Sequence, residues 1–315
     1  MLEAFAGLSP IWRVTVAVLA VLVVASAAVL AVRRRVTPAL ASELVTRTAS
    51  WWVMAAVFFG AILLHRWAAL ALLAFASFWA LKEYLTLLPT RPADHRALAW
   101  AFLAVPIQYL WIGAGGYGMA IIFIPVYMFL LLPLRMVLAG DTHGFVASAT
   151  QLQWGLMAFV FGLSHLGMLL VLPVAGPPGV DGRTLLLFLV ITVELSDVLQ
   201  FCWGKLLGRH KVIPTVSPNK TWEGLIGGVL SAAVIALTLR FLTPFSPAEA
   251  FGIALLACLA GFFGGAVMSA VKRDFGVKDF GYLIPGHGGM LDRLDSLCYA
   301  APVFFHCVRY FFGAP

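Results

Sequence analysis

Apolar runs long enough to cross a bilayer follow one another along the whole chain, with short polar segments between them. A membrane helix needs roughly 20 apolar residues, whereas the strands of a membrane barrel would alternate over about 10. The runs cover residues 11–32, 51–64, 67–88, 97–113, 119–138, 154–174, 185–203, 225–241, 250–271 and 294–312. The pattern predicts an all-α, polytopic transmembrane helical bundle with roughly ten spans.

The basic residues predict how this bundle is oriented. Arg33, Arg34 and Arg35 follow the first run, and Lys and Arg are retained on the cytoplasmic side of a membrane. The N-terminus should therefore face outward, and alternation then places every strongly basic loop on the cytoplasmic side. The first run lacks a basic leader and a small-residue cleavage site, so we expect it to be an anchor and not a signal peptide.

Composition agrees with a membrane protein and argues against other classes. The chain is 62% hydrophobic and only 11% charged, with a formal net charge of +7. Because most Lys and Arg lie in short loops beside apolar runs, topology and anionic ligands explain this charge better than nucleic acid does. The four cysteines form no C-x-x-C pair, which favours buried small side chains over a metal site or disulfides.

Polar chemistry is distributed unevenly between the two parts of the chain. Residues 1–180 are almost purely apolar, which is typical of a bundle region that could also supply an interface between subunits. Residues 181–315 contain three polar constellations. We therefore predict that residues 181–315 form the functional region.

The first constellation is a pair of acids inside a predicted span. Glu194 and Asp197 are spaced i and i+3, so they share one face of a helix. Ionisable groups at this depth are costly and usually line the bundle interior or a water-filled cavity. The pair indicates a ligand or metal site, with a structural ion pair as the alternative. Lys82 and Glu83, near the end of another run, are interpreted as interfacial residues.

The second constellation occupies residues 216–224, just before a predicted span. Ser217 followed by Pro218 is typical of a helix start, with Ser217 as the N-cap. Lys220 is not explained by capping. A lysine and hydroxyl groups over the free N–H groups of a helix N-terminus can bind an anion, and this predicts a phosphate site. The alternative is capping combined with the charge bias of cytoplasmic loops.

The third constellation covers residues 269–295, the most polar stretch of the chain. Lys272 and Arg273 lie where one predicted span ends, and Asp292 and Asp295 begin the last span at i and i+3. Two carboxylates on one helical face are suitable ligands for Mg²⁺, which also accepts substrate phosphates and waters. Arg293 could instead pair with either acid in a structural network. Together the three constellations indicate phosphoryl or nucleotidyl transfer on a lipid.

The second and third constellations also resemble a known family. The spacing Ser269-x-x-Lys272-Arg273-x4-Lys278-Asp279-x-Gly281-x3-Pro285-x-His287-Gly-Gly-x-x-Asp292-Arg293-x-Asp295 is similar to the signature of phosphatidate cytidylyltransferases. Ser217-Pro-x-Lys220-Thr221-Trp222-Glu223-Gly224 resembles the second motif of that family. The resemblance covers roughly residues 185–310; the first half adds only Glu83 and Tyr84.

The resemblance implies an enzyme of the bacterial inner membrane. Its reaction would be attack of the phosphate of phosphatidate on CTP, which gives CDP-diacylglycerol and pyrophosphate at the cytoplasmic face. It would require Mg²⁺, and a second cation is compatible with the motif. A homodimer is expected. The carried-over residues are, as catalytic groups, Asp292, Asp295, Lys272, Lys278 and Asp279; for substrate, Ser217, Lys220, Thr221, Glu223, Arg273, His287 and Arg293; and for metal, Asp197, Asp292 and Asp295.

Two departures from the family pattern suggest a diverged branch. After Asp197 the family has small residues and then Ala-Tyr, where this chain has Gln200 and Phe201. The family also has Gly-Asp before its Ser-x-x-Lys-Arg motif, where this chain has Gly264 and Gly265. Two alternatives follow. One is an enzyme that uses another lipid phosphate or nucleotide-activated donor, as in glycolipid synthesis. The other is a catalytically impaired protein that still binds lipid or nucleotide.

Overall fold

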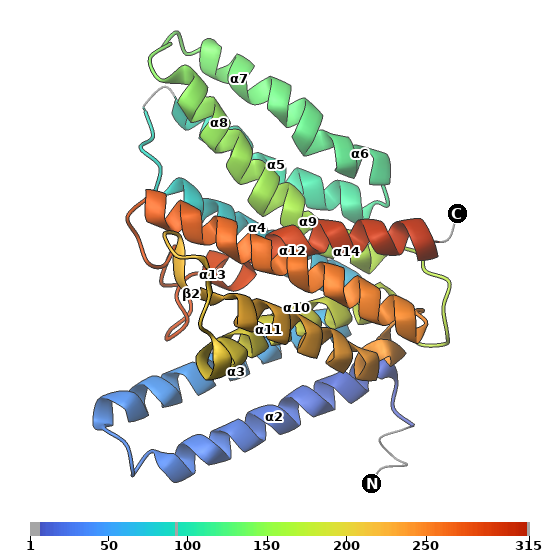
Figure 1. Cartoon of the computed structure of the whole chain (residues 1–315). Coiled ribbons are helices and arrows are strands. Elements are labelled where there is room, and N and C mark those ends of the chain that lie inside the picture. The colour runs from blue at the N-terminus through green and yellow to red at the C-terminus, as the bar shows by residue number, and fades with distance from the viewer. Residues whose placement is uncertain (1–6, 92–93, 314–315) are drawn as a thin grey trace.

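The computed structural model describes residues 7–91 and 94–313, and they form a helical bundle (Figure 1). The elements, in chain order, are α2 (Pro10–Val32), α3 (Pro38–Leu64), α4 (Arg66–Leu85), α5 (His95–Gly113), α6 (Tyr117–Ile122), η2 (Phe123–Met128), α7 (Phe129–Val137), α8 (Phe145–Gly155), η3 (Leu156–Gly162), α9 (Leu163–Val171), α10 (Gly182–Leu207), β1 (Lys211–Ile213), β2 (Ser217–Thr221), α11 (Trp222–Ala236), η4 (Leu237–Leu242), α12 (Pro247–Asp274), α13 (Leu291–Leu294) and α14 (Leu297–Phe312).

The predicted helical membrane fold is confirmed. Among the described residues, eight helical segments are long and apolar enough to cross a membrane. Two further predicted spans, now α5 with 19 residues and α14 with 16, also pack in the bundle but are not among these eight. The number of candidate spans by length and composition is therefore eight, against the roughly ten expected.

The helices begin where local capping chemistry allows. Asp181 caps α10 and Ser246 caps α12, each in a reciprocal capping box. Thr37 caps α3, which has Pro38 at its first position and extends to Leu64. The predicted span at 51–64 is therefore the apolar part of a longer helix of 27 residues.

One prediction about a helix start is wrong. Ser217 does not cap a helix, because residues Ser217–Thr221 form strand β2, antiparallel to β1. The helix begins at Trp222, and the hydroxyl of Thr221 accepts the N–H of Gly224 at 3.1 Å. The error came from reading Ser217 and Pro218 locally, since the partner strand that satisfies this backbone lies earlier in the chain.

The polar connections gather at one end of the bundle. Figure 1 shows the turn between α2 and α3, strand β2 and helix α13 at one end, with the described start of α2 and the end of α14 at the other. Contacts join these connections: the Nη1 of Arg91 donates to the carbonyl of His143, and the Nε of Arg273 donates to the carbonyl of Val216 at 3.3 Å. The second and third polar constellations thus lie toward the same end.

Candidate active site

Asp292 organises the loop between α12 and the last helices. Its Oδ2 accepts the backbone N–H groups of Phe280 at 2.8 Å and Gly289 at 3.0 Å, and its Oδ1 accepts a hydrogen bond from Nζ of Lys272 at 3.0 Å. Asp292 is only 7% exposed. A buried carboxylate with three donors is well compensated, and this arrangement holds the loop against the end of α12.

Glu83, from α4, holds the same loop from the other side. Its carboxylate oxygens accept the N–H groups of Met290 at 3.0 Å and Leu291 at 2.8 Å, at the start of α13. A Cβ at Gly289 would lie 2.5 Å from Oε2 of Glu83, so this position needs glycine. The interfacial interpretation of Glu83 missed this role. A glutamate in an apolar run was the available signal, because such a group is costly unless it is paired.

The three constellations meet around Gly265 of α12. A Cβ built at Gly265 would lie 3.4 Å from Nζ of Lys220, 3.5 Å from Oγ of Ser296 and 3.9 Å from Oδ2 of Asp295. The hydroxyl of Ser296 donates to Oδ2 of Asp197 at 2.6 Å. The side chains that meet here come from α10, from β2 and from the segment before α14. Because Gly265 has no side chain, space remains beside them.

Around Gly265, burial and neighbouring charges of both signs shift the pKa values of Asp295 and Lys220. Burial, followed by the charge of Asp197, raises the pKa of Asp295 to about 6, and Lys272 and Lys220 oppose this shift. Burial lowers the pKa of Lys220, while Asp197 and Asp295 counter the effect. The ammonium of Lys220 also lies 4.4 Å from the ring centroid of Phe262. A cation held in this way is well placed to attract phosphate.

The remaining predicted residues lie around this centre or on the hairpin beside it. Lys278 is exposed, and Asp279 faces Gly288 across the loop. Arg293 is exposed within electrostatic range of Glu194 and His287. Ser217 is partly buried on strand β2.

Three predicted substrate residues make internal contacts that position the hairpin. Glu223 accepts the backbone N–H groups of Arg209 and His210 and pairs with the ring of His210 at 2.6 Å. Thr221 caps α11. Arg273 donates to the hairpin carbonyl of Val216. Each of these contacts ties the chain around β2 to a neighbouring helix.

The carboxylates differ in their fitness for a divalent cation. Both oxygens of Asp292 are occupied by protein donors. Oδ1 of Asp295 accepts the backbone N–H of Ser296 at 2.8 Å, and its Oδ2 lies 3.9 Å from the position of a Cβ at Gly265. Among described residues no group of three or more His, Cys, Asp or Glu side chains is arranged to hold a metal. Mg²⁺ uses one or two carboxylates with phosphates and water. Asp295 is the best-placed carboxylate for such an ion, because the oxygens of Asp197 accept hydrogen bonds from Ser296 at 2.6 Å and Gln200 at 3.4 Å and Asp197 would have to release a donor to join it.

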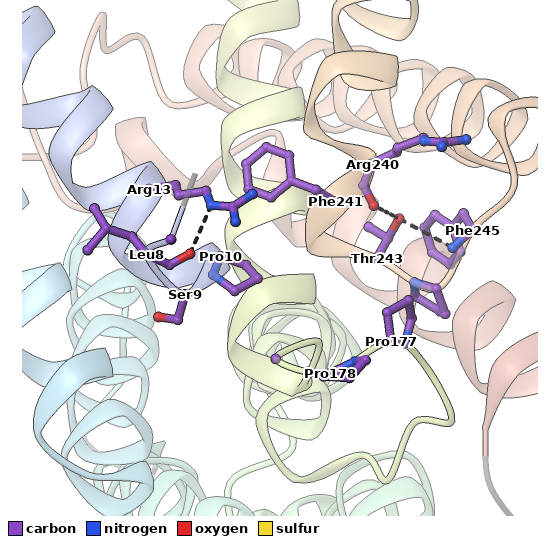
Figure 2. A pocket seen from close by; sticks show the side chains of 13 residues that line it. Leu8, Ser9, Pro10, Arg13, Pro177, Pro178, Arg240, Phe241, Thr243 and Phe245 are labelled. Carbon is purple, nitrogen blue, oxygen red and sulfur yellow. Dashed lines mark hydrogen bonds between the residues drawn. The ribbon is translucent and has the colours of Figure 1, made fainter. Parts of the chain in front are cut away.

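A cavity of about 690 Å³ lies at the opposite end of the bundle and contains none of these residues. Figure 2 shows Arg13, Phe241 and Phe245 around it, with Pro177 and Pro178 on its floor. It lies near the start of α2 and the end of η4, far from β2 and α13 (Figure 1). The chemistry-bearing residues are therefore at the other end of the bundle.

Comparisons with known proteins identify relatives of this chain. A protein from Escherichia coli (strain K12) named "Uncharacterized protein YnbB" is 44% identical over 269 residues, which are 85% of this chain and 88% of the relative. Phosphatidate cytidylyltransferase of Staphylococcus aureus (strain COL) is 39% identical over 125 residues, and that of Staphylococcus saprophyticus is 38% identical over 125. Each match covers 39% of this chain and 48% of the relative, so the chain matches about half the length of these two proteins.

A family model described as the cytidylyltransferase family matches residues 45–311, a range that includes α4, the hairpin and all residues around Gly265. This match and the convergence of the three constellations lead to one conclusion. The chain belongs to the cytidylyltransferase family and is a nucleotidyltransferase similar to phosphatidate cytidylyltransferases.

Proposed function

We propose that this protein transfers the cytidylyl group of CTP to phosphatidate at the cytoplasmic face of a bacterial inner membrane. A phosphate oxygen of phosphatidate attacks the α-phosphorus of CTP, the bond from that phosphorus to the β-phosphate oxygen breaks, and pyrophosphate leaves as CDP-diacylglycerol forms. The observation that carries the proposal is the meeting of Lys220, Asp295 and Ser296 at Gly265, beside helices of membrane-spanning length.

The residues have separate tasks in this proposal. Lys220 and Lys272 neutralise the phosphates of CTP, because cationic groups in a partly buried site stabilise the charge that develops during transfer. Asp197 and Asp295 are the residues that would hold Mg²⁺, which when bound supplies further charge neutralisation on the phosphates. Asp292 and Glu83 hold the loop that presents Lys278 and His287. A homodimer remains part of the proposal.

The test compares two aspartates in purified protein. Asp295→Asn should reduce CDP-diacylglycerol formation by about 100-fold or more and leave thermal stability near that of the unmodified protein. Asp292→Asn should lower both activity and the unfolding temperature, because the loop loses its charged acceptor. Absence of CTP- and Mg²⁺-dependent product from the unmodified protein, with CTP binding intact, would remove the proposal.

A second candidate is the same chemistry on a different lipid phosphate or with a different nucleotide. Two observations favour it: Gln200 donates to Ser196 at 2.9 Å and to Asp197 at 3.4 Å, so a departure from the family pattern touches the site, and Gly265 lies at its centre. A panel of nucleotides and lipid phosphates separates the candidates. Binding without turnover of any pair would indicate an impaired enzyme.

A further inference from the structure

We propose that Arg47 of α3 completes, with Arg293 and His287, the binding site for the phosphate group of the lipid substrate. The inference rests on the proposed function, and it assigns a binding role to a residue outside both signature motifs. In this assignment Lys220 and Lys272 bind the phosphates of the nucleotide, and Arg47, Arg293 and His287 bind the phosphate of the lipid.

One face of α3 docks on the turn that carries His287. The hydroxyl of Ser50 donates to the carbonyl of Pro285 at 2.7 Å, and the ring of Trp51 meets the ring of His287 edge-on, with centroids 5.7 Å apart. A Cβ at Gly286 would lie 2.8 Å from Cγ of Arg47. Positions 47, 50 and 51 are spaced i, i+3 and i+4, so a single helical face contacts three consecutive residues of the turn.

Gly286 allows this close approach. Its φ is +76°, in the left-handed region that glycine adopts freely, and the stem of Arg47 occupies the space that a side chain would need. The stem of Arg47 thereby contacts the turn, and the side chain remains accessible, since it is 52% exposed. Arg47 pairs with Glu43 at 2.7 Å, an exposed i,i+4 contact that a phosphate can replace at little cost.

Two arginines from separate elements, Arg47 of α3 and Arg293 of α13, lie within electrostatic range of His287. Burial lowers the pKa of His287 most, the Pro285 carbonyl opposes that shift, and the charges of Arg293 and Arg47 lower it further. Arg293 is also within electrostatic range of Glu194 and Asp197, which connects the turn to the centre at Gly265. A phosphate monoester carries up to two negative charges, and guanidinium groups bind it with paired hydrogen bonds.

The depth of Arg47 in the membrane favours a lipid over a free nucleotide. The 27 residues of α3 extend about 40 Å, whereas the hydrocarbon core is about 30 Å thick. A span of about 20 residues counted back from Leu64 begins near Val45, so Arg47 lies at headgroup level. Trp51 and Trp52 lie about one helical turn after Arg47, and aromatic residues of this kind are enriched at membrane interfaces. Since most of α3 is exposed outside the bundle, a headgroup can approach Arg47 laterally.

The experiment measures binding and turnover with a variant that keeps the stem of the arginine. Arg47→Met should weaken retention of phosphatidate by about tenfold or more, as expected for loss of a charge-assisted hydrogen bond, and leave CTP affinity unchanged. Binding is measured by native mass spectrometry of purified protein with phosphatidate, and with phosphatidylcholine as the neutral lipid. In turnover assays the KM for phosphatidate should rise while the KM for CTP stays constant.

Two matched variants complete the design. Arg35→Met removes the same charge from an exposed turn at the same end and should bind phosphatidate normally. Glu43→Gln frees Arg47 from its partner and should preserve or tighten phosphatidate binding. The inference would be overturned if Arg47→Met retained phosphatidate as well as the unmodified protein, or if it lost affinity for CTP and not for phosphatidate. Because the lipid-binding arm needs no turnover, it gives an answer even if CDP-diacylglycerol never forms.

Discussion

Two buried carboxylates, Glu83 and Asp292, hold residues 280–291 in place by accepting backbone N–H groups. Together they accept four backbone N–H groups, and the side chain of Lys272 also donates to Asp292. Hydrogen bonds to a charged acceptor are individually stronger than neutral ones. Individual residues of the site therefore have one of two tasks: some would bind substrate, and others, such as Glu83 and Asp292, fix the loop on which Lys278 and His287 lie.

Replacing Glu83 tests its positioning role. Glu83→Ala leaves the N–H groups of Met290 and Leu291 without their acceptor in a region where Glu83 is only 4% exposed. We expect the variant to lose about 2–4 kcal/mol of stability, seen as a lower unfolding temperature in detergent. Glu43→Gln, on the exposed part of α3, should unfold at the unmodified temperature. Equal stability of both variants would contradict the role of Glu83.

Gly265 gives a prediction about the centre of the site. In Gly265→Asp the new carboxylate would lie beside Nζ of Lys220, which is 3.4 Å from the position of the added Cβ. Neutralising this ammonium should raise the KM for CTP by about tenfold, whereas Gly265→Ala should change it little. Steady-state kinetics of the two variants makes the comparison. A large gain of turnover in Gly265→Asp would instead indicate an enzyme that has lost a required carboxylate.

At the scale of elements, connections far apart in sequence are tied together. Arg91 and Asp94 pair at 2.6 Å in the segment between α4 and α5, and Arg91 also reaches the carbonyl of His143 before α8. The docking of α3 on the His287 turn and the hairpin contact of Arg273 are similar links. Such contacts let loops at the ends of separate helices maintain one arrangement.

The pair of Arg91 and Asp94 predicts a dependence of stability on pH. The hydrogen bond from Arg91 is the main cause that lowers the pKa of Asp94 below its ordinary 3.8, and burial opposes it. A depressed pKa in the folded state contributes stability that is complete above 3.8 and is lost as pH falls through the lower folded value. The unfolding temperatures of the unmodified protein and Asp94→Asn should therefore differ above pH 3.8 and converge as pH falls below 3.8 through the lower folded pKa. A constant difference over this range would contradict the prediction.

At the scale of the whole molecule, the arrangement predicts which end faces the cytoplasm. The turn with Arg33, Arg34 and Arg35 lies at the same end as β2 and α13 (Figure 1). Basic loops remain on the cytoplasmic side, so the site should open there. The connection between α5 and α6, which includes the exposed Ala114, lies at the other end (Figure 1).

Cysteine labelling tests this orientation. In a background in which Cys202, Cys258, Cys298 and Cys307 are replaced by alanine, Arg35→Cys should react with an impermeant maleimide only in inverted vesicles. Ala114→Cys should react in intact cells, because its connection faces the opposite side. Labelling of both positions from one side would contradict the predicted topology.

Much of this molecule followed from local sequence. Apolar runs determined the membrane class and the helical fold, because hydrocarbon forces backbone groups to pair within a helix. Spacing within residues 269–295 predicted a polar site and the similarity to cytidylyltransferases, since those residues are near one another in the chain. The prediction that Ser217 caps a helix was wrong, because this residue lies in a strand that pairs with Lys211–Ile213.

Only the tertiary structure decided which polar residues act together. The contacts of Glu83 with Met290 and of Ser50 with Pro285 join positions separated by 207 and 235 residues. No periodicity encodes such pairs, because they depend on how the helices pack. The same packing places Gly265 beside Lys220 and Asp295, so the consequence of its missing side chain could be judged only in three dimensions.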